Sequence, residues 1–191
     1  MRYFPVLLDV KDQPCVVVGA GQVAQRKIAA LLRSQAKVIL VSPVLCAGLR
    51  RFAQSGKIVV RRQPYSTAYI RGARLVIAAT NDPKVNARVS RDCRQAGIPV
   101  NVVDAPAQCS FIVPAVAEKG GLIIAVSTSG QAPALSKKIR RDLMPLIRGQ
   151  YLPLLRKVRA ARQRLRSGGV GFCRRKKILT AMVCSGAKGK R

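Results

Sequence analysis

The sequence predicts an α/β fold in which a doubly wound parallel sheet is followed by a small extended region and a helical C-terminal segment. Two observations carry this prediction. Through residues 1–106, short β-branched and apolar runs alternate with stretches of helical periodicity, as repeated βα units with a buried sheet require. Beyond residue 106 the alternation gives way to two extended runs and then to long basic segments.

The first βα unit lies in QPCVVVGAGQVAQRKIAALLRSQAKVILVSP, residues 13–43. A strand over residues 15–18 precedes Gly19 and Gly21, which open a helix, and KVILVS forms the next strand. Gly19 permits the tight turn, and Gly21 lets the backbone approach a pyrophosphate held by the N–H groups of the helix N-terminus. This strand–GxGxxA–helix–strand unit predicts a Rossmann-like dinucleotide site; the alternative is a mere tight turn between strand and helix.

The alternation then continues to the end of a predicted fifth strand. Pro83 suits the first turn of a helix, and Gly97 suits its end. The predicted elements are a helix over 44–55, strands over 57–62 and 74–80, a helix over 83–96 and a strand over 98–104.

Polar residues gather where these strands end. Ligands of such sheets bind beyond the carboxyl ends of the strands, so we expect Ser42, Thr80 and Asn81 to line the dinucleotide cleft. Asp82 precedes a proline and is typical of a helix cap. Asp104, which ends the fifth strand, is either a turn residue or a functional carboxylate.

One feature of the dinucleotide fingerprint is missing. Ser42, Pro43 and Val44 stand where an Asp or Glu is expected to hold the adenosine ribose. Charge therefore leaves the choice between NAD and NADP open. Arg50 and Arg51 follow on a helical stretch, where they are either surface charges or attract a 2′-phosphate.

The second half of the chain changes character. SFIVPA and GLIIAVSTSG are extended runs separated by a Lys-Gly-Gly turn, which predicts a small antiparallel pair. A helix is expected from Pro133, and Pro145 and Pro153 are expected to interrupt the helical segments after it. The expected organisation is a dinucleotide-binding domain over 1–106, an extended region over 107–132, a helical segment over 133–166 and a poorly ordered basic tail over 167–191.

The amino-acid composition excludes several kinds of catalytic and metal site. The chain holds 36 Lys plus Arg, seven Asp plus Glu, and no His, and its six Cys form no CxxC pair. Most zinc sites and histidine bases are thereby excluded, no metal-ligating set is predicted, and the cysteines are expected to be buried or idle. Residues 131–191 hold 18 of the basic residues and one acidic residue, which suits a polyanionic partner but equally a solvated surface that binds nucleic acid only nonspecifically.

No apolar run is long enough to span a bilayer, and the N-terminus lacks the pattern of a signal peptide. We therefore expect a cytoplasmic protein without membrane contact.

The ordered segments FPVLLDVKDQPCVVVGAGQVAQRK, AKVILVSP, RLVIAATNDPKVNARVS, IPVNVVDAPAQCSFIVPA and STSGQAPALSKKIR resemble the precorrin-2 dehydrogenase family of siroheme synthesis, including the N-terminal module of siroheme synthases. The resemblance implies NAD-dependent oxidation of precorrin-2 to sirohydrochlorin, and in bifunctional members the insertion of ferrous iron. It also implies NAD as the cofactor, a tetrapyrrole polycarboxylate as the substrate, and a homodimer that uses residues 107–132 as its dimerisation region.

The resemblance also implies roles for individual residues. Asp104 matches the catalytic aspartate of the family, with Thr128 standing where some members carry Ser. The residues expected near the dinucleotide are Gly19, Gly21, Gln22, Val23, Ser42, Pro43, Val44, Thr80 and Asn81, and those expected near the tetrapyrrole are Asn101, Ser127, Thr128, Ser129 and Lys137.

Two functions from different classes remain open at this point. In the enzyme, Asp104 accepts the proton released during oxidation, and basic side chains bind the substrate carboxylates. In the alternative, the chain is a dinucleotide-sensing regulatory domain whose basic C-terminal segment binds nucleic acid or another subunit.

Overall fold

The computed structural model describes residues 2–186. Contacts between residues divide the chain into two compact units, Met1–Val113 and Pro114–Arg191. The division falls shortly after residue 106, where the sequence predicts the end of the dinucleotide-binding domain. In the described part of the chain, no helix is both long enough and apolar enough to cross a membrane.

The first unit is built on a five-stranded sheet with the order β3-β2-β1-β4-β5, and all neighbouring strands are parallel. The central strand is almost wholly buried, because it has a neighbouring strand on each side and helices above and below. This arrangement confirms the predicted parallel α/β sheet. The strands are β1 (Pro14–Val18), β2 (Lys37–Val41), β3 (Ile58–Arg61), β4 (Leu75–Ala78) and β5 (Val100–Val102).

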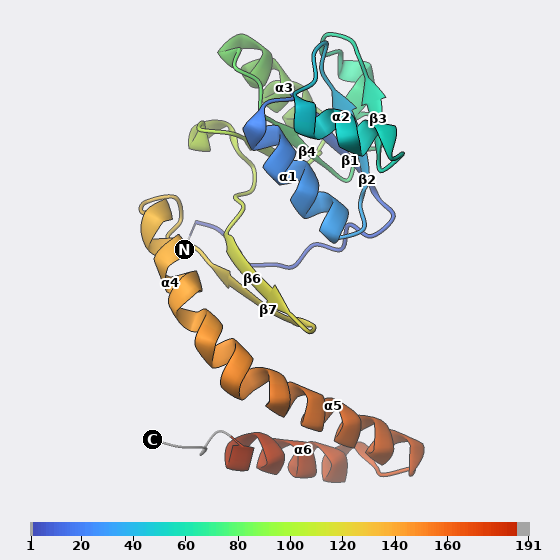
Figure 1. Ribbon diagram of the computed structural model, residues 1–191, viewed down its shortest axis with the longest axis vertical. Helices are drawn as coiled ribbons and strands as arrows, with labels where there is room; N and C mark the ends of the chain where they lie inside the picture. Colours follow the sequence, from blue (N-terminus) through green and yellow to red (C-terminus); the bar gives the residue numbers. More distant parts are fainter. Residues whose placement is uncertain (1, 187–191) are drawn as a thin grey trace. The chain divides into compact units, whose positions relative to one another are not determined.

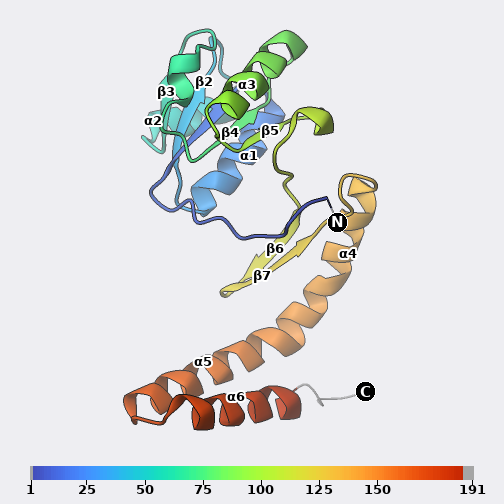
Figure 2. The same cartoon turned by 180° about the vertical axis from the view of Figure 1, so that it is seen from behind.

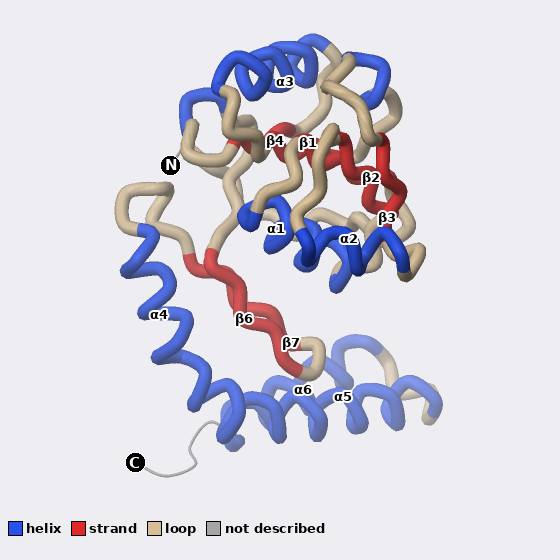
Figure 3. The backbone as a smooth tube through the Cα atoms, turned by 45° about the horizontal axis from the view of Figure 1, so that its top comes forward, coloured by secondary structure: helices blue, strands red, loops and turns tan. Residues whose placement is uncertain are grey.

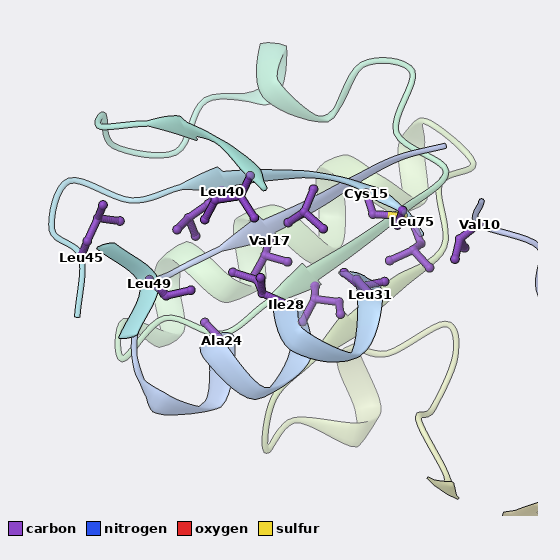
Figure 4. Close-up of a cluster of buried hydrophobic side chains, with 14 residues drawn as sticks. Val10, Cys15, Val17, Ala24, Ile28, Leu31, Leu40, Leu45, Leu49 and Leu75 are labelled. Carbon is purple, nitrogen blue, oxygen red and sulfur yellow. The ribbon is translucent and has the colours of Figure 1, made fainter. Parts of the chain in front are cut away.

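Helices cover both faces of this sheet (Figure 3). The helices α1 (Gln22–Arg33) and α2 (Ala47–Gln54) pack on one face, where Val17, Leu40, Ile28 and Leu49 meet in a buried cluster (Figure 4). The helix α3 (Pro83–Gln95) packs on the other face with a short 3₁₀ turn at Thr67–Ile70. Successive residues of β1 therefore serve opposite cores, because side chains alternate along a strand.

The second unit begins with an antiparallel hairpin of β6 (Ala115–Lys119) and β7 (Leu122–Val126). Its two turn residues are Gly120 and Gly121, with φ angles of 57° and 87°. Two positive φ angles in a two-residue hairpin loop match the twist of the strands, and glycine adopts them at little cost. The predicted antiparallel pair and its glycine turn are confirmed, but the first strand begins at Ala115 and runs to the turn, so most of the predicted SFIVPA run lies outside it.

A long helical run comes after the hairpin, and here the predicted interruptions are wrong. The helix α4 (Pro133–Leu146) passes through Pro145, a π-helical turn spans Ile147–Tyr151, and α5 (Leu152–Ser167) contains Pro153 in its first turn. Proline lacks the N–H that an interior helical position donates. The wider π turn lies between the two prolines, so the change in hydrogen-bond pattern there lets the helical path continue.

The prediction that the basic tail is poorly ordered is also wrong for the described residues. Residues Phe172–Gly186 form the helix α6, which runs beside α5 (Figures 1 and 2). Gly169, with a φ of 70°, allows the sharp turn between the two helices, and the Val170 N–H donates to the Leu165 carbonyl. The tail lacks a regular apolar stripe, which is why periodicity did not reveal it. Residues 187–191, the rest of the predicted tail, lie outside the described residues.

The cysteines behave largely as the composition suggests. Cys15, Cys93 and Cys109 are buried, whereas Cys173 and Cys184 on α6 are exposed. Burial raises the pKa of the Cys15 thiol to about 11 and that of Cys93 to about 12. Both thiols therefore stay protonated at neutral pH and act as small apolar side chains.

Candidate dinucleotide-binding groove and catalytic carboxylate

A groove of about 510 Å³ lies at the carboxyl ends of β1, β2 and β4. The connections from β1 and from β4 pass over opposite faces of the sheet, so the groove sits where the strand order reverses. None of the side chains that line it is charged. The lining comprises Val18, Gly19, Ala20, Gly21, Val41, Ser42, Pro43, Val44, Leu45, Cys46, Pro64, Tyr65, Ala79, Thr80, Asn81 and Val85.

Gly19 is required by the packing of the sheet itself. Its φ is 101°, and a Cβ atom at this position would lie 2.3 Å from the Ala79 carbonyl oxygen. The Gly19 N–H donates to the Val41 carbonyl, which ties the turn to the neighbouring strand. Any side chain here collides with backbone, so this glycine keeps the floor of the groove intact.

No steric contact within the protein requires glycine at position 21. Its φ is −81°, and a Cβ atom there would meet nothing within 4 Å. As the N-cap residue of α1 it offers no side chain to the N–H groups of the first turn, to which Gln22 and Val23 belong. These donors have no acceptor within the helix, and the helix dipole makes the place favourable for an anion. The position therefore fits a pyrophosphate.

The helix α3 shows the contrasting case. The Asp82 carboxylate accepts from the Lys84 N–H at 2.8 Å and the Val85 N–H at 3.4 Å, so this helix is capped by its own chain. The interpretation of Asp82 as a helix cap is confirmed. Of the two helices whose N-termini follow β1 and β4, α1 is the one left open to a phosphate.

The end of β4 is held by a residue that the sequence did not suggest. Asn86 is buried on α3, and its Nδ2 donates to the Thr80 carbonyl at 3.0 Å. The Thr80 hydroxyl lies 2.8 Å from Asn86 Oδ1. Thr80 is therefore fixed in place, and Asn81, which follows it, is exposed at the rim of the groove. A buried amide on a helix leaves no periodic signal in the sequence.

Asp104 lies just beyond β5 at the same edge of the sheet. It is exposed, and its backbone φ of 58° lies in the left-handed region. Within residues 2–186, no donor forms a hydrogen bond or salt bridge with its carboxylate. Non-glycine residues in this conformation cost energy, and they concentrate at functional sites.

Lys27, on α1, is the charged neighbour that the sequence did not reveal. It is half-buried, and burial together with Arg26 lowers the pKa of its amine, while Cys109 and Asp104 act in the opposite direction. Asp104 is thus close enough to interact with it electrostatically. Helical spacing from Ala24 and Ile28, which face the core, was the available signal that Lys27 lies beside the buried face.

Asn101, expected near the tetrapyrrole, has a structural role within the first unit. It is buried in β5, and its Nδ2 donates to the Phe111 carbonyl at 3.1 Å. The Cys109 sulfur accepts from the Val102 N–H at 3.1 Å in the same loop. Both side chains therefore hold the segment after β5 against the strand, and contact of Asn101 with the tetrapyrrole stays a prediction.

The serine-rich stretch lies in the second unit, between β7 and α4. The Thr128 hydroxyl accepts from the Ala132 N–H at 3.0 Å and lies 3.2 Å from the Ser136 hydroxyl. The Ser129 N–H donates to the Ser127 hydroxyl at 3.1 Å. Thr128 is thus engaged in folding the loop, whereas Ser127, Ser129 and Lys137 are exposed. Contact of these residues with the tetrapyrrole stays a prediction.

Comparisons with known proteins agree with this geometry. Residues 6–115 match the family described as "Putative NAD(P)-binding", and residues 119–143 match "Sirohaem biosynthesis protein central". A siroheme synthase of Methylobacillus flagellatus is 42% identical over 151 residues, covering 79% of this chain and 32% of the relative. One of Nitrosococcus oceani is 35% identical over 191 residues, covering 100% of this chain and 41% of the relative.

Among solved structures, SirC, a precorrin-2 dehydrogenase, superimposes with a TM-score of 0.76 at 28% identity, covering 95% of this chain and 89% of that one. The chain spans roughly a third to two fifths of the length of the two siroheme synthases. Two consecutive family matches, in the order of the two structural units, together with this fold, identify its relatives. The chain belongs to the family of siroheme synthase N-terminal modules, in which an NAD(P)-binding domain is followed by the central region of sirohaem biosynthesis proteins.

Proposed function

We propose that the protein oxidises precorrin-2 to sirohydrochlorin with NAD as the hydride acceptor. One observation carries the proposal: an uncharged groove beside the open N-terminus of α1 lies at the same sheet edge as the exposed, conformationally strained Asp104. The names of the similar proteins, siroheme synthase and precorrin-2 dehydrogenase, support the choice of reaction.

The proposed chemistry removes a hydride and a proton from the substrate. A bound dinucleotide would supply the hydride acceptor. The N–H groups of Gln22 and Val23 would hold its pyrophosphate, and Pro43 and Val44, which line the groove, would lie near its adenosine. Asp104 takes the proton, a role for which an exposed carboxylate with unused acceptor sites is suited.

The charge of the protein supports a polycarboxylate substrate. Precorrin-2 carries eight carboxylates, and this chain contains 36 basic and only seven acidic residues. Such a field attracts anions and accelerates their encounter. Lys27 is the cation near Asp104, and we propose that it binds a substrate carboxylate there, with Lys137 serving the same purpose in the second unit.

Replacing Lys27 by Met is expected to raise KM for precorrin-2 by about tenfold, the range expected for losing a charge-assisted hydrogen bond. The kcat should change much less, because the reacting groups stay in place. Met preserves most of the apolar stem, so the melting temperature should hold or rise once the half-buried charge is removed. Lys27→Arg is the matched control and should keep KM within a few-fold of wild type. Equal KM values for the Lys27→Met variant and the wild type, measured in steady-state assays, would remove Lys27 from the proposed site.

We also propose that the protein is a homodimer whose contact includes the β6–β7 hairpin. One face of the hairpin packs against α4 and the π turn, whereas Val116 and Ile123 are 43% and 46% exposed on it. Sedimentation equilibrium should give twice the mass of the chain, and Val116→Lys with Ile123→Lys should shift the protein to the monomer. Leu135→Lys, an exposed position on α4 outside the hairpin, is the control. A wild-type monomer at micromolar concentration contradicts this proposal.

Incubation of the protein with precorrin-2 and NAD⁺ tests the proposed reaction against the regulatory alternative. We expect the absorbance of sirohydrochlorin to appear only when both are present. If no NADH forms and the protein instead binds DNA tightly in a salt-sensitive manner, the regulatory domain is the better account. Insertion of iron, the second reaction that the family resemblance implies for bifunctional members, is assayed separately by adding Fe²⁺ and sirohydrochlorin without NAD⁺.

A further inference from the structure

A second groove, of about 640 Å³, lies at the opposite edge of the parallel sheet, where the strands begin. Lys37, which lines it, is the first residue of β2, whereas Ser42 of the dinucleotide groove follows the last residue of the same strand. A strand of this length spans roughly 16 Å, so the two grooves are separate. The proposed oxidation uses none of the residues that line the second groove.

The floor of the second groove is apolar. Leu32 from α1 and Phe52 from α2 are half-buried there, and both pack against the core cluster between these helices and the sheet. Ala29 and Ala36 contribute only methyl groups to the lining, so space remains beside the two larger side chains. An apolar ring system placed on this floor would leave water and gain contact with hydrocarbon.

Three cations surround this apolar floor. Arg33 ends α1, Lys37 begins β2, and Lys57 directly precedes β3. All three are exposed, and none of them forms a salt bridge within residues 2–186. Asp12 is the one acidic residue in the lining, and it also has no salt-bridge partner in the described chain. The groove therefore carries an excess of positive charge that attracts an anion.

Two helices end beside the groove, and a bare helix C-terminus would repel an anion. Here the last carbonyls of both helices already accept hydrogen bonds from the turns that follow. The donors are the N–H groups of Ser34, Gln35 and Ala36 after α1 and those of Ser55, Gly56 and Lys57 after α2. Arg33 and Lys57 also lie where their charges offset the negative ends of the helix dipoles.

We propose that the second groove binds a small amphiphilic anion, in which an apolar ring system carries a carboxylate or a sulfonate. The ring system lies on Leu32 and Phe52, and the anionic group faces the surrounding cations. The inference goes beyond the proposed oxidation and is independent of it, because it involves neither the dinucleotide groove nor Asp104.

The test is a fluorescence titration with anilinonaphthalenesulfonate, a probe that combines aromatic rings with a sulfonate. We expect saturable binding whose Kd is unchanged by saturating NAD⁺. Lys37→Gln combined with Lys57→Gln should weaken the binding at least about fivefold, because two cations facing the sulfonate are lost. Arg71→Gln combined with Lys84→Gln removes the same charge from exposed positions elsewhere in the first unit and should leave Kd within about twofold of wild type.

A third variant tests the apolar floor without changing any charge. Ala29→Phe should fill the space beside Leu32 and weaken probe binding at least about tenfold, with the melting temperature showing that the protein remains folded.

Three results would overturn the inference. Equal losses in the two double variants would mean that the probe responds only to net charge. Displacement of the probe by NAD⁺ would place it in the dinucleotide groove. Wild-type affinity in a folded Ala29→Phe variant would place the probe on another apolar surface.

Discussion

Replacing Asp104 by Asn is expected to lower kcat for precorrin-2 oxidation by at least about a hundredfold, the usual contribution of a positioned base. Asn has the same shape and is also among the residues most tolerant of the left-handed conformation, so the turn with its φ of 58° should persist. The amide cannot accept the proton. Steady-state kinetics and thermal unfolding of both proteins check this, with dinucleotide affinity expected to stay near wild type.

Asp104→Gly separates chemistry from conformation. Glycine adopts a positive φ without the steric cost, so this variant should be as stable as wild type or more stable by up to about 1 kcal/mol, yet equally inactive. Stability gained as activity is lost indicates strain retained for function. Wild-type turnover by the Asn variant would instead make Asp104 a turn residue, which is the other interpretation that the sequence allowed.

Replacing Gly21 by Asp is expected to weaken NADH binding by at least about a hundredfold while leaving the protein folded, since each tenfold corresponds to about 1.4 kcal/mol. A Cβ atom meets nothing within 4 Å at this position, and Asp is a favoured N-cap residue. Its carboxylate would bond the open N–H groups of α1 and place negative charge where the pyrophosphate binds. Titration calorimetry and thermal unfolding measure the two effects.

Two control variants make this prediction specific. Gly21→Ser supplies an N-cap hydroxyl without charge, so it should lose much less affinity than Gly21→Asp. Gly19→Ala should instead lower the stability of the fold by at least about 2 kcal/mol, because its methyl group would press on the Ala79 carbonyl in a strained backbone. Undiminished NADH binding by Gly21→Asp contradicts the assignment of this helix N-terminus to the pyrophosphate.

The parallel sheet and the glycine turn were predictable because the responsible signals are local. Buried strands such as β1 and β4 need continuous apolar runs. The positive φ of Gly19 and the nearby Ala79 carbonyl restrict that position to glycine. Ser42 and Thr80 line the groove because parallel strands bring their carboxyl ends to one edge of the sheet, which is also why their position there could be anticipated; their contact with a dinucleotide stays a prediction.

Other features depend on contacts between distant segments and left no local trace. Asn101, which was expected near the tetrapyrrole, is buried in β5 and its amide donates to the Phe111 carbonyl, a contact between segments that the sequence does not reveal. Lys27 becomes a candidate site residue because the turn that carries Asp104, far away in the sequence, lies close to it in the fold. The helix α6 depends on packing beside α5 after the turn at Gly169, and the π turn between the two prolines could not be read from residue preferences.

The most direct test of the proposed reaction is a single-turnover experiment that follows NADH and sirohydrochlorin together after anaerobic mixing of the protein with precorrin-2 and NAD⁺. The proposed reaction predicts that the two products appear at the same rate and in equimolar amounts, and that neither appears with the Asp104→Asn variant. Sirohydrochlorin formed without NADH, or equal rates for the wild type and the variant, would contradict it.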